Sequence, residues 1–253
     1  MATQSVATAL HILEAVARLQ PVGLSELTRE TAVSKATVQR CLATLRDEHW
    51  LRQTTDSGQW VLTTKAFVIG AQVPDAQRIR EMALRTLSDL QDYTKENVHL
   101  MVPEGRTMVL IERLDSAHPV RVFRPIGGAR PMHATANGIA YLAYQPPAVA
   151  EEYIAAGLEP VTEHTTTDPD TFIALLEQVR RQGYAINEQG LEDGTTAVAA
   201  PILGPDQRSI AAFSISAPSI RLTPDLYPDY GQRALHASKE ISHGTGPLEA
   251  GRT

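Results

Sequence analysis

The chain has 253 residues, 43% of them hydrophobic and 21% charged, which is enough apolar material for one large or two ordinary folded domains. No run of about 18 apolar residues is present, which excludes a hydrophobic membrane span. The single cysteine, Cys41, excludes an intrachain disulfide and a cysteine-based metal cluster. The N-terminus lacks the basic and apolar segments of a secretory signal. We therefore expect a cytoplasmic protein with no membrane partner, no metal and no cofactor.

The net charge of −6 is unevenly distributed along the chain. Residues 1–65 carry a net charge of +1, whereas the remainder carries −7. This asymmetry weakly favours nucleic-acid binding by the first part, with few phosphate contacts from one copy of the chain. A dimer would double those contacts.

The first three predicted elements are helices joined by short connections. Residues 6–20 repeat apolar side chains with helical spacing, and residues 23–30 indicate a short second helix with Ser25 as its N-cap. A third helix is expected to begin behind Ser34, a second N-cap, and to bury one apolar stripe. That stripe consists of Val38, Cys41, Leu42 and Leu45. A short helix, a tight turn and a second helix form a helix-turn-helix motif.

The opposite face of the third helix is small, polar and basic, which suits insertion into the DNA major groove. For this helix alone, a solvated surface face is the competing interpretation. The segments 50–53 and 59–62 add a predicted hairpin, with Gly58 where a positive φ is needed, and make the motif winged. The expected DNA-binding residues are Ser25, Ser34, Lys35, Ala36, Thr37, Gln39, Arg40 and Arg52.

A connecting helix is expected at residues 63–73, followed by a longer helix that opens at Pro74. We place the domain boundary there, with a DNA-binding domain at residues 1–73 and an effector-binding and oligomerisation domain at residues 74–253. No low-complexity linker separates the two parts, so the connection is expected to be helical.

Beyond residue 97 the pattern changes to antiparallel strands with helices between and after them, which predicts an α+β fold of helices on one sheet. The predicted strands are 97–102, 107–114, 120–124, 184–187, 195–202 and 209–216. The predicted helices are 136–144, one that ends at Gly157, 168–181 and 224–242.

No catalytic signature is found in the sequence. The glycine-containing segments do not match phosphate-binding or dinucleotide-binding loops, and no serine lies in a nucleophile elbow. His133 is a candidate metal ligand. A histidine within a tight loop is more often held by hydrogen bonds as a structural residue, and we favour that interpretation.

A binding site for an anion is better supported. Thr135 is placed to cap a helix, which would leave the backbone N–H groups of Ala136, Asn137 and Gly138 at its positive end. Ser214 and Ser216 lie two apart on one strand, so their hydroxyls face the same side. The competing interpretations are an ordinary capped helix and two solvent-exposed hydroxyls.

The chain resembles the IclR family of bacterial transcription regulators from about residue 5 to about residue 242. The resemblance lies in the winged helix-turn-helix and in residues 131–143 (PMHATANGIAYLA), Gly183-Tyr184 and 212–218 (AFSISAP). It implies a GAF-like effector domain and a pocket that uses Ala136, Asn137, Asn187, Ala197, Ser214 and Ser216. Asn187 replaces a common acidic residue, and Ala197 replaces a cysteine found in several members. These departures imply a roomier and less negative pocket.

The resulting hypothesis is a DNA-binding regulator controlled by a small aliphatic or aromatic carboxylate, acting as a homodimer or homotetramer on operator DNA. The carboxylate is expected at the helix end with neutral donors around it and no Arg or Lys inside the pocket. One alternative is an enzyme acting on a small acid with an accessory DNA-binding module, which requires a convergent base or nucleophile. Another is a pure interaction scaffold.

Overall fold

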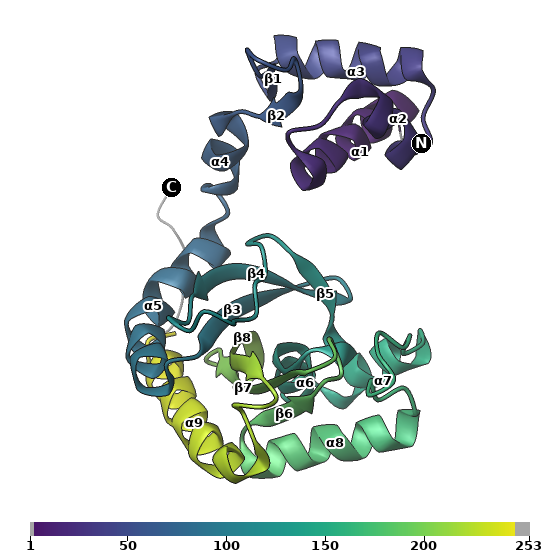
Figure 1. Cartoon of the computed structure of the whole chain (residues 1–253). Helices are drawn as coiled ribbons and strands as arrows, with labels where there is room; N and C mark the ends of the chain where they lie inside the picture. Colours follow the sequence, from purple (N-terminus) through teal and green to yellow (C-terminus); the bar gives the residue numbers. More distant parts are fainter. Residues whose placement is uncertain (1–2, 246–253) are drawn as a thin grey trace, which may run out of the picture. The chain divides into compact units, whose positions relative to one another are not determined.

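The computed structural model describes residues 3–245. The chain divides into two compact units, Met1–Gln77 and Arg78–Thr253, which are described separately (Figure 1). The division falls inside α5 (Pro74–Thr94). No helix of residues 3–245 is long and apolar enough to cross a bilayer.

The first unit is a winged helix-turn-helix. Its helices are α1 (Gln4–Leu19), α2 (Leu24–Thr31) and α3 (Lys35–Asp47), followed by strands β1 (Leu51–Gln53) and β2 (Trp60–Leu62) and the short α4 (Thr64–Gly70). β1 and β2 pair antiparallel, and Gly58 in their turn has a φ of +65°, as predicted. The apolar stripes of α1 and α3 meet in one core around Ile12, Leu27, Val38 and Leu42, each of which is almost fully buried. Burial of one such side chain stabilises the fold by about 1.5–3 kcal/mol.

Ser34 caps α3 as predicted, because its hydroxyl accepts a hydrogen bond from the backbone N–H of Thr37 at 3.4 Å. The predicted cap of α2 was wrong. Gly23 is the N-cap, and Ser25 is the second residue of the helix with an exposed side chain. Leu24, the first helical residue, packs against the core of this unit, and the extended Gly23 precedes it without a side-chain cap.

The second unit is built on a six-stranded antiparallel sheet with the order β5-β4-β3-β8-β7-β6. The strands are β3 (Asn97–Glu104), β4 (Thr107–Leu114), β5 (Ala129–Pro131), β6 (Ala185–Glu188), β7 (Thr195–Leu203) and β8 (Ser209–Pro218). The helices are α5, α6 (Ala136–Ala143), α7 (Pro147–Ala155), α8 (Pro169–Gln182) and α9 (Tyr227–His243), with the 3-10 turns η1 (Met132–Ala134) and η2 (Pro224–Leu226).

The strand predicted at residues 120–124 was wrong, because β5 occupies the edge beside β4 instead. Side chains, and not a neighbouring strand, bind the carbonyls of this segment. Asn97 donates to the carbonyl of Val122 at 2.8 Å, and Arg221 donates to the carbonyl of Val120 at 3.0 Å. The alternating apolar pattern therefore marks an extended loop that other side chains hold in place.

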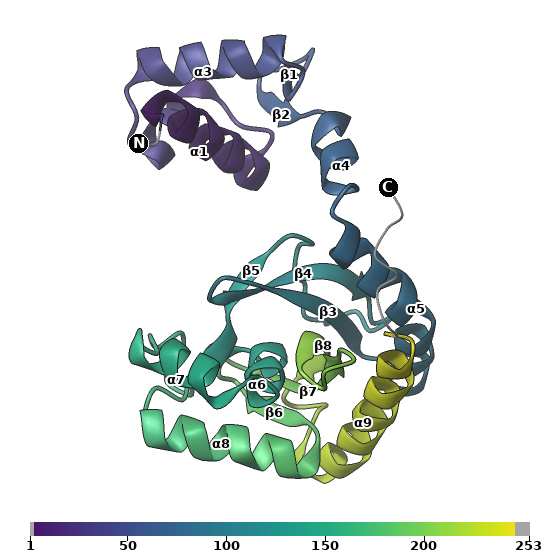
Figure 2. The same ribbon diagram turned by 180° about the vertical axis from the view of Figure 1, so that it is seen from behind.

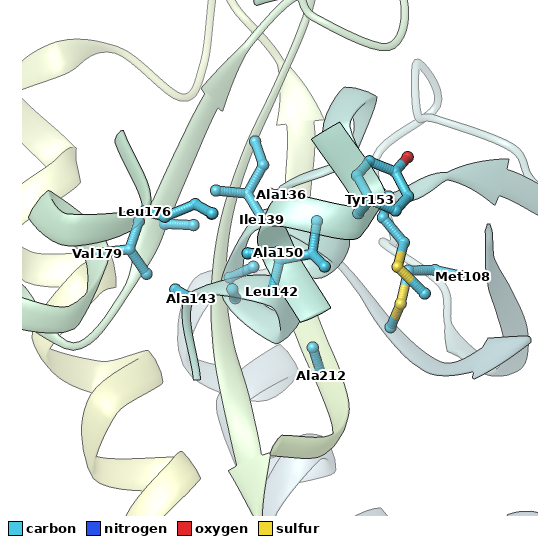
Figure 3. Packing of buried hydrophobic residues seen from close by; sticks show 14 of the residues in the cluster. Met108, Ala136, Ile139, Leu142, Ala143, Ala150, Tyr153, Leu176, Val179 and Ala212 are labelled. Atoms are coloured by element: carbon cyan, nitrogen blue, oxygen red, sulfur yellow. The ribbon is translucent and has the colours of Figure 1, made fainter. Parts of the chain in front are cut away.

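Helices cover both faces of the sheet (Figures 1 and 2). α5 and α9 pack on one face, where Val98, Leu100, Phe213 and Ile215 point toward them. α6 packs on the other face, and α7 and α8 complete the second core around it (Figure 3). Because side chains alternate along β3, its even-numbered residues point toward α5 and α9, and its odd-numbered residues point toward α6.

Candidate DNA-binding and effector sites

The outward face of α3 carries unpaired positive charge. Lys35, Gln39 and Arg40 are exposed, and Thr37 is half-buried at the base of the helix. The Thr37 hydroxyl accepts from the Ser34 hydroxyl at 3.0 Å and from the Arg40 guanidinium at 3.5 Å, which orders the first turn. Among residues 3–245, no carboxylate pairs with Lys35 or Arg40.

The remaining residues of the predicted DNA-binding set are separate from that turn. Arg52 is exposed on β1, in the wing, and Ser25 is exposed on α2. Ala36 is exposed in the first turn of α3 and adds no side chain long enough to hinder close approach. The structure therefore brings the α3 residues together, while Ser25 and Arg52 lie on flanking elements.

A small cavity in the second unit collects seven of the eight predicted effector residues. The seven are Thr135, Ala136, Asn137, Asn187, Ala197, Ser214 and Ser216. Six lining residues were not predicted: His99, Met101, Arg124, Arg130, Leu191 and Thr195. The cavity volume is about 30 Å³, which is enough to hold water.

Strand register builds the floor of this cavity. Asn187 pairs with Ala197, and Ala197 pairs with Ser216, so these three residues form a row across β6, β7 and β8. In the neighbouring row, His99 of β3 pairs with Ser214 of β8. Within the described part of the chain, the Ser214 and Ser216 hydroxyls make no hydrogen bond. Both therefore remain available to a ligand.

The N-terminus of α6 forms the opposite wall. Thr135 is the N-cap, and its hydroxyl accepts a hydrogen bond from the backbone N–H of Gly138 at 3.0 Å. The backbone N–H groups of Ala136 and Asn137 have no partner among the described residues. Two free N–H groups at the positive end of a helix can bind one carboxylate.

Gly138 was expected to contribute a third N–H group, but that group is bound to Thr135 and Gly138 does not line the cavity. The glycine has a packing role instead. A Cβ at this position would lie 2.2 Å from the carbonyl oxygen of Met132, so only glycine lets α6 approach η1 this closely.

Asparagine side chains hold the walls together. The Asn187 amide donates to the carbonyl of Ala134 at 2.6 Å and accepts from the backbone N–H of Gly190 at 3.1 Å. The Asn137 amide nitrogen donates to the carbonyl of Ala212 at 3.1 Å. Asn187, which the resemblance places in the pocket, therefore already makes two hydrogen bonds within the folded chain.

Two arginines line the cavity, contrary to the expectation of a pocket without Arg or Lys. Arg124 forms an ion pair with Glu192 at 2.8 Å, which joins the loops after β4 and β6. Burial lowers the pKa of Arg124, the negative charge of Glu192 opposes this, and the positive charge of Arg130 lowers the pKa further. Arg130 makes one hydrogen bond, to the carbonyl of Ala129, and has no carboxylate partner in residues 3–245. The cavity is thus suited to an anion.

His99 is the second departure from the expected pocket. Its side chain is almost fully buried, and its Nε2 atom has no hydrogen-bond partner in the described chain. Burial, together with the positive charges of Arg124 and Arg113, lowers the pKa of His99 from 6.5 to about 3. The ring is therefore neutral at physiological pH. The signal in the sequence is a polar residue between Val98 and Leu100 on a predicted strand, at a position that points to the opposite face from these two apolar neighbours.

His133 is held on both sides. Its Nδ1 lies 2.8 Å from the Tyr153 hydroxyl, and its Nε2 lies 2.8 Å from the carbonyl oxygen of Glu159. Such a ring has no nitrogen left for a metal or a proton-transfer role, in agreement with the structural interpretation. Within residues 3–245, no cluster of three or more His, Cys, Asp or Glu side chains is arranged to hold a metal ion.

Two protein-family models match the sequence of this chain. The model of the bacterial transcriptional regulator IclR C-terminal region matches residues 71–243, and the IclR helix-turn-helix model matches residues 5–55. The chain belongs to the IclR family. It is an IclR-type DNA-binding transcription regulator, and the resemblance inferred from the sequence is confirmed.

Relatives within the family are similar over nearly the whole chain. The HTH-type transcriptional regulator KdgR of Escherichia coli is 32% identical over 247 residues, covering 96% of this chain and 92% of that protein. The transcriptional repressor IclR of Escherichia coli is 28% identical, covering 97% and 91%. A crystal structure of an IclR homolog from Microbacterium hydrocarbonoxydans, complexed with 4-hydroxybenzoate, is 26% identical with a TM-score of 0.83, covering 95% and 98%.

Proposed function

We propose that this IclR-type regulator binds operator DNA under the control of a small carboxylate held in the cavity below α6. The observation that carries the proposal is the convergence of free donors on that cavity. Five donor groups around the cavity lack a negatively charged partner within the described chain. They are the N–H groups of Ala136 and Asn137, the hydroxyls of Ser214 and Ser216, and the Arg130 guanidinium. An anion satisfies them together.

The carboxylate binds with one oxygen at the N-terminus of α6 and accepts hydroxyl hydrogen bonds from the sheet below. Arg130 adds a charge-assisted hydrogen bond, which contributes about 1.5–3 kcal/mol. The complex of a family member with 4-hydroxybenzoate supports an effector of this general class. When the carboxylate binds to the second unit, it changes the fraction of molecules whose two DNA domains are spaced to match the two half-sites of the operator.

In the first unit, α3 enters the major groove. Arg40 contacts a base edge or phosphate, Lys35 and Thr37 contact the backbone, and Ala36 and Gln39 face the bases. Arg52 extends from the wing toward phosphate, and Ser25 contributes from α2. The support for this assignment is the exposed, unpaired positive charge on the outer face of α3.

A homodimer, or a homotetramer, is the proposed assembly, and the cytoplasm the proposed location. α4 supports assembly because Phe67, Val68 and Ile69 are exposed at 78%, 57% and 47%. Several large exposed apolar side chains on one short helix favour a protein interface there. An enzymatic function has less support, because both ring nitrogens of His133 are held by Tyr153 and the Glu159 carbonyl, and His133 does not line the cavity.

The test begins with DNA fragments retained by the full-length protein, which supply an operator for fluorescence anisotropy. Small carboxylates are then titrated against the protein–operator complex. At least one acid should change operator affinity, and Arg130→Gln should weaken the response to that acid at least tenfold. Arg181→Gln, an exposed change on α8, is the matched control and should leave the response unchanged. An acid response that is equal in both variants would place the effector elsewhere.

A further inference from the structure

The cavity contains more polar groups without partners than one carboxylate can satisfy. Beside the donors at the α6 end, the His99 Nε2 atom is buried without a partner, and the Thr195 hydroxyl makes no hydrogen bond to another described residue. His99 lies in the sheet row next to the one that holds Ser216, and pairs with Ser214. The floor of the cavity is therefore polar from β3 to β7.

A buried polar group without a hydrogen bond destabilises the fold, and a ligand that covers the group with carbon leaves it unpaired. A plain aliphatic or aromatic acid would satisfy the helix end and cover His99 with an apolar body. An acid that carries a hydroxyl satisfies both regions. A site that binds a substrate hydroxyl strongly rejects analogues without that hydroxyl, because the polar groups of the site are then left unpaired.

We propose that the effector is a small aliphatic hydroxy acid and that His99 is the specificity-determining residue that binds its hydroxyl. This inference rests on the proposed function, since it assigns the class of acid to the same cavity. The carboxylate lies between the α6 N-terminus and Arg130, and the hydroxyl lies against Nε2 of His99. A hydroxyl both donates and accepts, so it pairs with Nε2 in either tautomer of a neutral imidazole.

Two further observations support this class. The cavity is small, at about 30 Å³, so it favours a compact aliphatic acid over an aromatic ring. The lowered pKa of His99 keeps its ring neutral at physiological pH, so His99 recognises its partner by hydrogen bonding and leaves the negative charge to Arg130.

The experiment uses matched pairs of acids that differ by one hydroxyl: acetate with glycolate, propionate with lactate, and benzoate with 4-hydroxybenzoate. Affinities for the full-length protein are measured by calorimetry. We expect the hydroxylated aliphatic acids to bind at least tenfold more tightly than their plain partners. His99→Leu should abolish this preference while retaining the affinity for the plain acid, and His99→Gln should restore part of it.

His236→Leu, which changes an exposed histidine on α9, is the control and should keep the full preference. In wild-type protein with ¹⁵N-labelled histidine, lactate should shift the His99 Nε2 signal more than propionate does. Equal affinities within each pair, or a preference that survives His99→Leu, overturn the inference. If Arg130→Gln still weakens both members of those pairs, the proposed function stands. The inference of an aliphatic hydroxy acid is also overturned if 4-hydroxybenzoate binds more tightly than every aliphatic acid. If none of the acids binds, the proposed function is overturned as well.

Discussion

His99 on β3 and Ser214 on β8 face each other across an antiparallel pair, and neither side chain donates or accepts a side-chain hydrogen bond within residues 3–245. Both lie on the face of the sheet that α6 covers. The folded chain therefore leaves polar groups unsatisfied at the position where the proposed effector binds. Stability and ligand recognition make opposite demands at such a position.

The first prediction concerns this conflict. His99→Leu should raise the free energy of unfolding of the effector-free protein by about 1–3 kcal/mol, because a buried unpaired nitrogen is replaced by apolar atoms. Urea unfolding of the full-length protein measures the change, with His236→Leu as control. A loss of stability in His99→Leu would show that Nε2 has a partner in solution.

The second prediction follows from the pKa of His99, which is about 3 in the folded chain and about 6.5 when unfolded. Between these values the unfolded chain binds the extra proton, so stability falls as the pH falls from 6.5 toward 3 and is complete above 6.5. The loss is about 1.4 kcal/mol per pH unit at most. Wild type should therefore lose more stability between pH 6.5 and pH 5 than His99→Gln. Parallel pH profiles of the two proteins would contradict this.

The third prediction concerns the contact of α6 with η1. Gly138→Ala should destabilise the second unit by about 1–3 kcal/mol or more, because the added methyl group overlaps the Met132 backbone. Gly70→Ala is the control, since a Cβ there meets no atom within 4 Å. Thermal unfolding should separate the two variants clearly, and similar midpoints would mean that α6 moves away from η1 at little cost.

The fourth prediction tests the DNA-binding face. Arg40→Ala should weaken operator binding by about 1–3 kcal/mol if the contact with guanine is bidentate, and the protein should remain folded because Arg40 is exposed. Arg46→Ala is the comparison, because Arg46 lies on the same helix and pairs with Asp47 at 2.9 Å. Anisotropy in matched salt measures both variants. Wild-type affinity in Arg40→Ala would remove this residue from the interface.

The fifth prediction concerns assembly. Phe67→Asp on α4 should shift the protein toward monomer and weaken operator binding, because a charge is placed in the proposed apolar interface. Ile220→Asp, at a side chain that is 85% exposed in the second unit, should leave the oligomer intact. Light scattering at micromolar concentration distinguishes these results. Wild-type protein that is already monomeric while bound to operator would refute the proposed assembly.

Local signals predicted most of the fold correctly. Apolar spacing located α1 and α3, and the hydroxyl of Ser34 capped its helix as expected, because these features depend on neighbouring residues alone. The segment 120–124 has the alternation of a strand, yet its carbonyls are bound by Asn97 and Arg221 from distant elements. The local sequence pattern of residues 120–124 does not indicate these distant hydrogen-bond partners.

The candidate site was predicted in part for the same reason. Strand register follows from alternation, so the sequence placed Ser214 and Ser216 on one face. Arg124 reaches the cavity from the loop after β4, and Arg130 reaches it from the edge strand β5. The paths of both segments depend on tertiary contacts that residue spacing along the chain does not encode. His99 lay within a predicted strand, but only the folded structure shows that its nitrogen lacks a partner.

The ion pair between Arg124 and Glu192 has a consequence for the order of binding events. It joins two loops beside a cavity of about 30 Å³, and we expect these loops to move apart when an acid enters. The rate of association should then level off at high acid concentration, at the rate of opening. The observed affinity is the intrinsic affinity multiplied by the small fraction of open molecules. Substitutions that loosen these loops would increase sensitivity to the effector without adding a single contact to it.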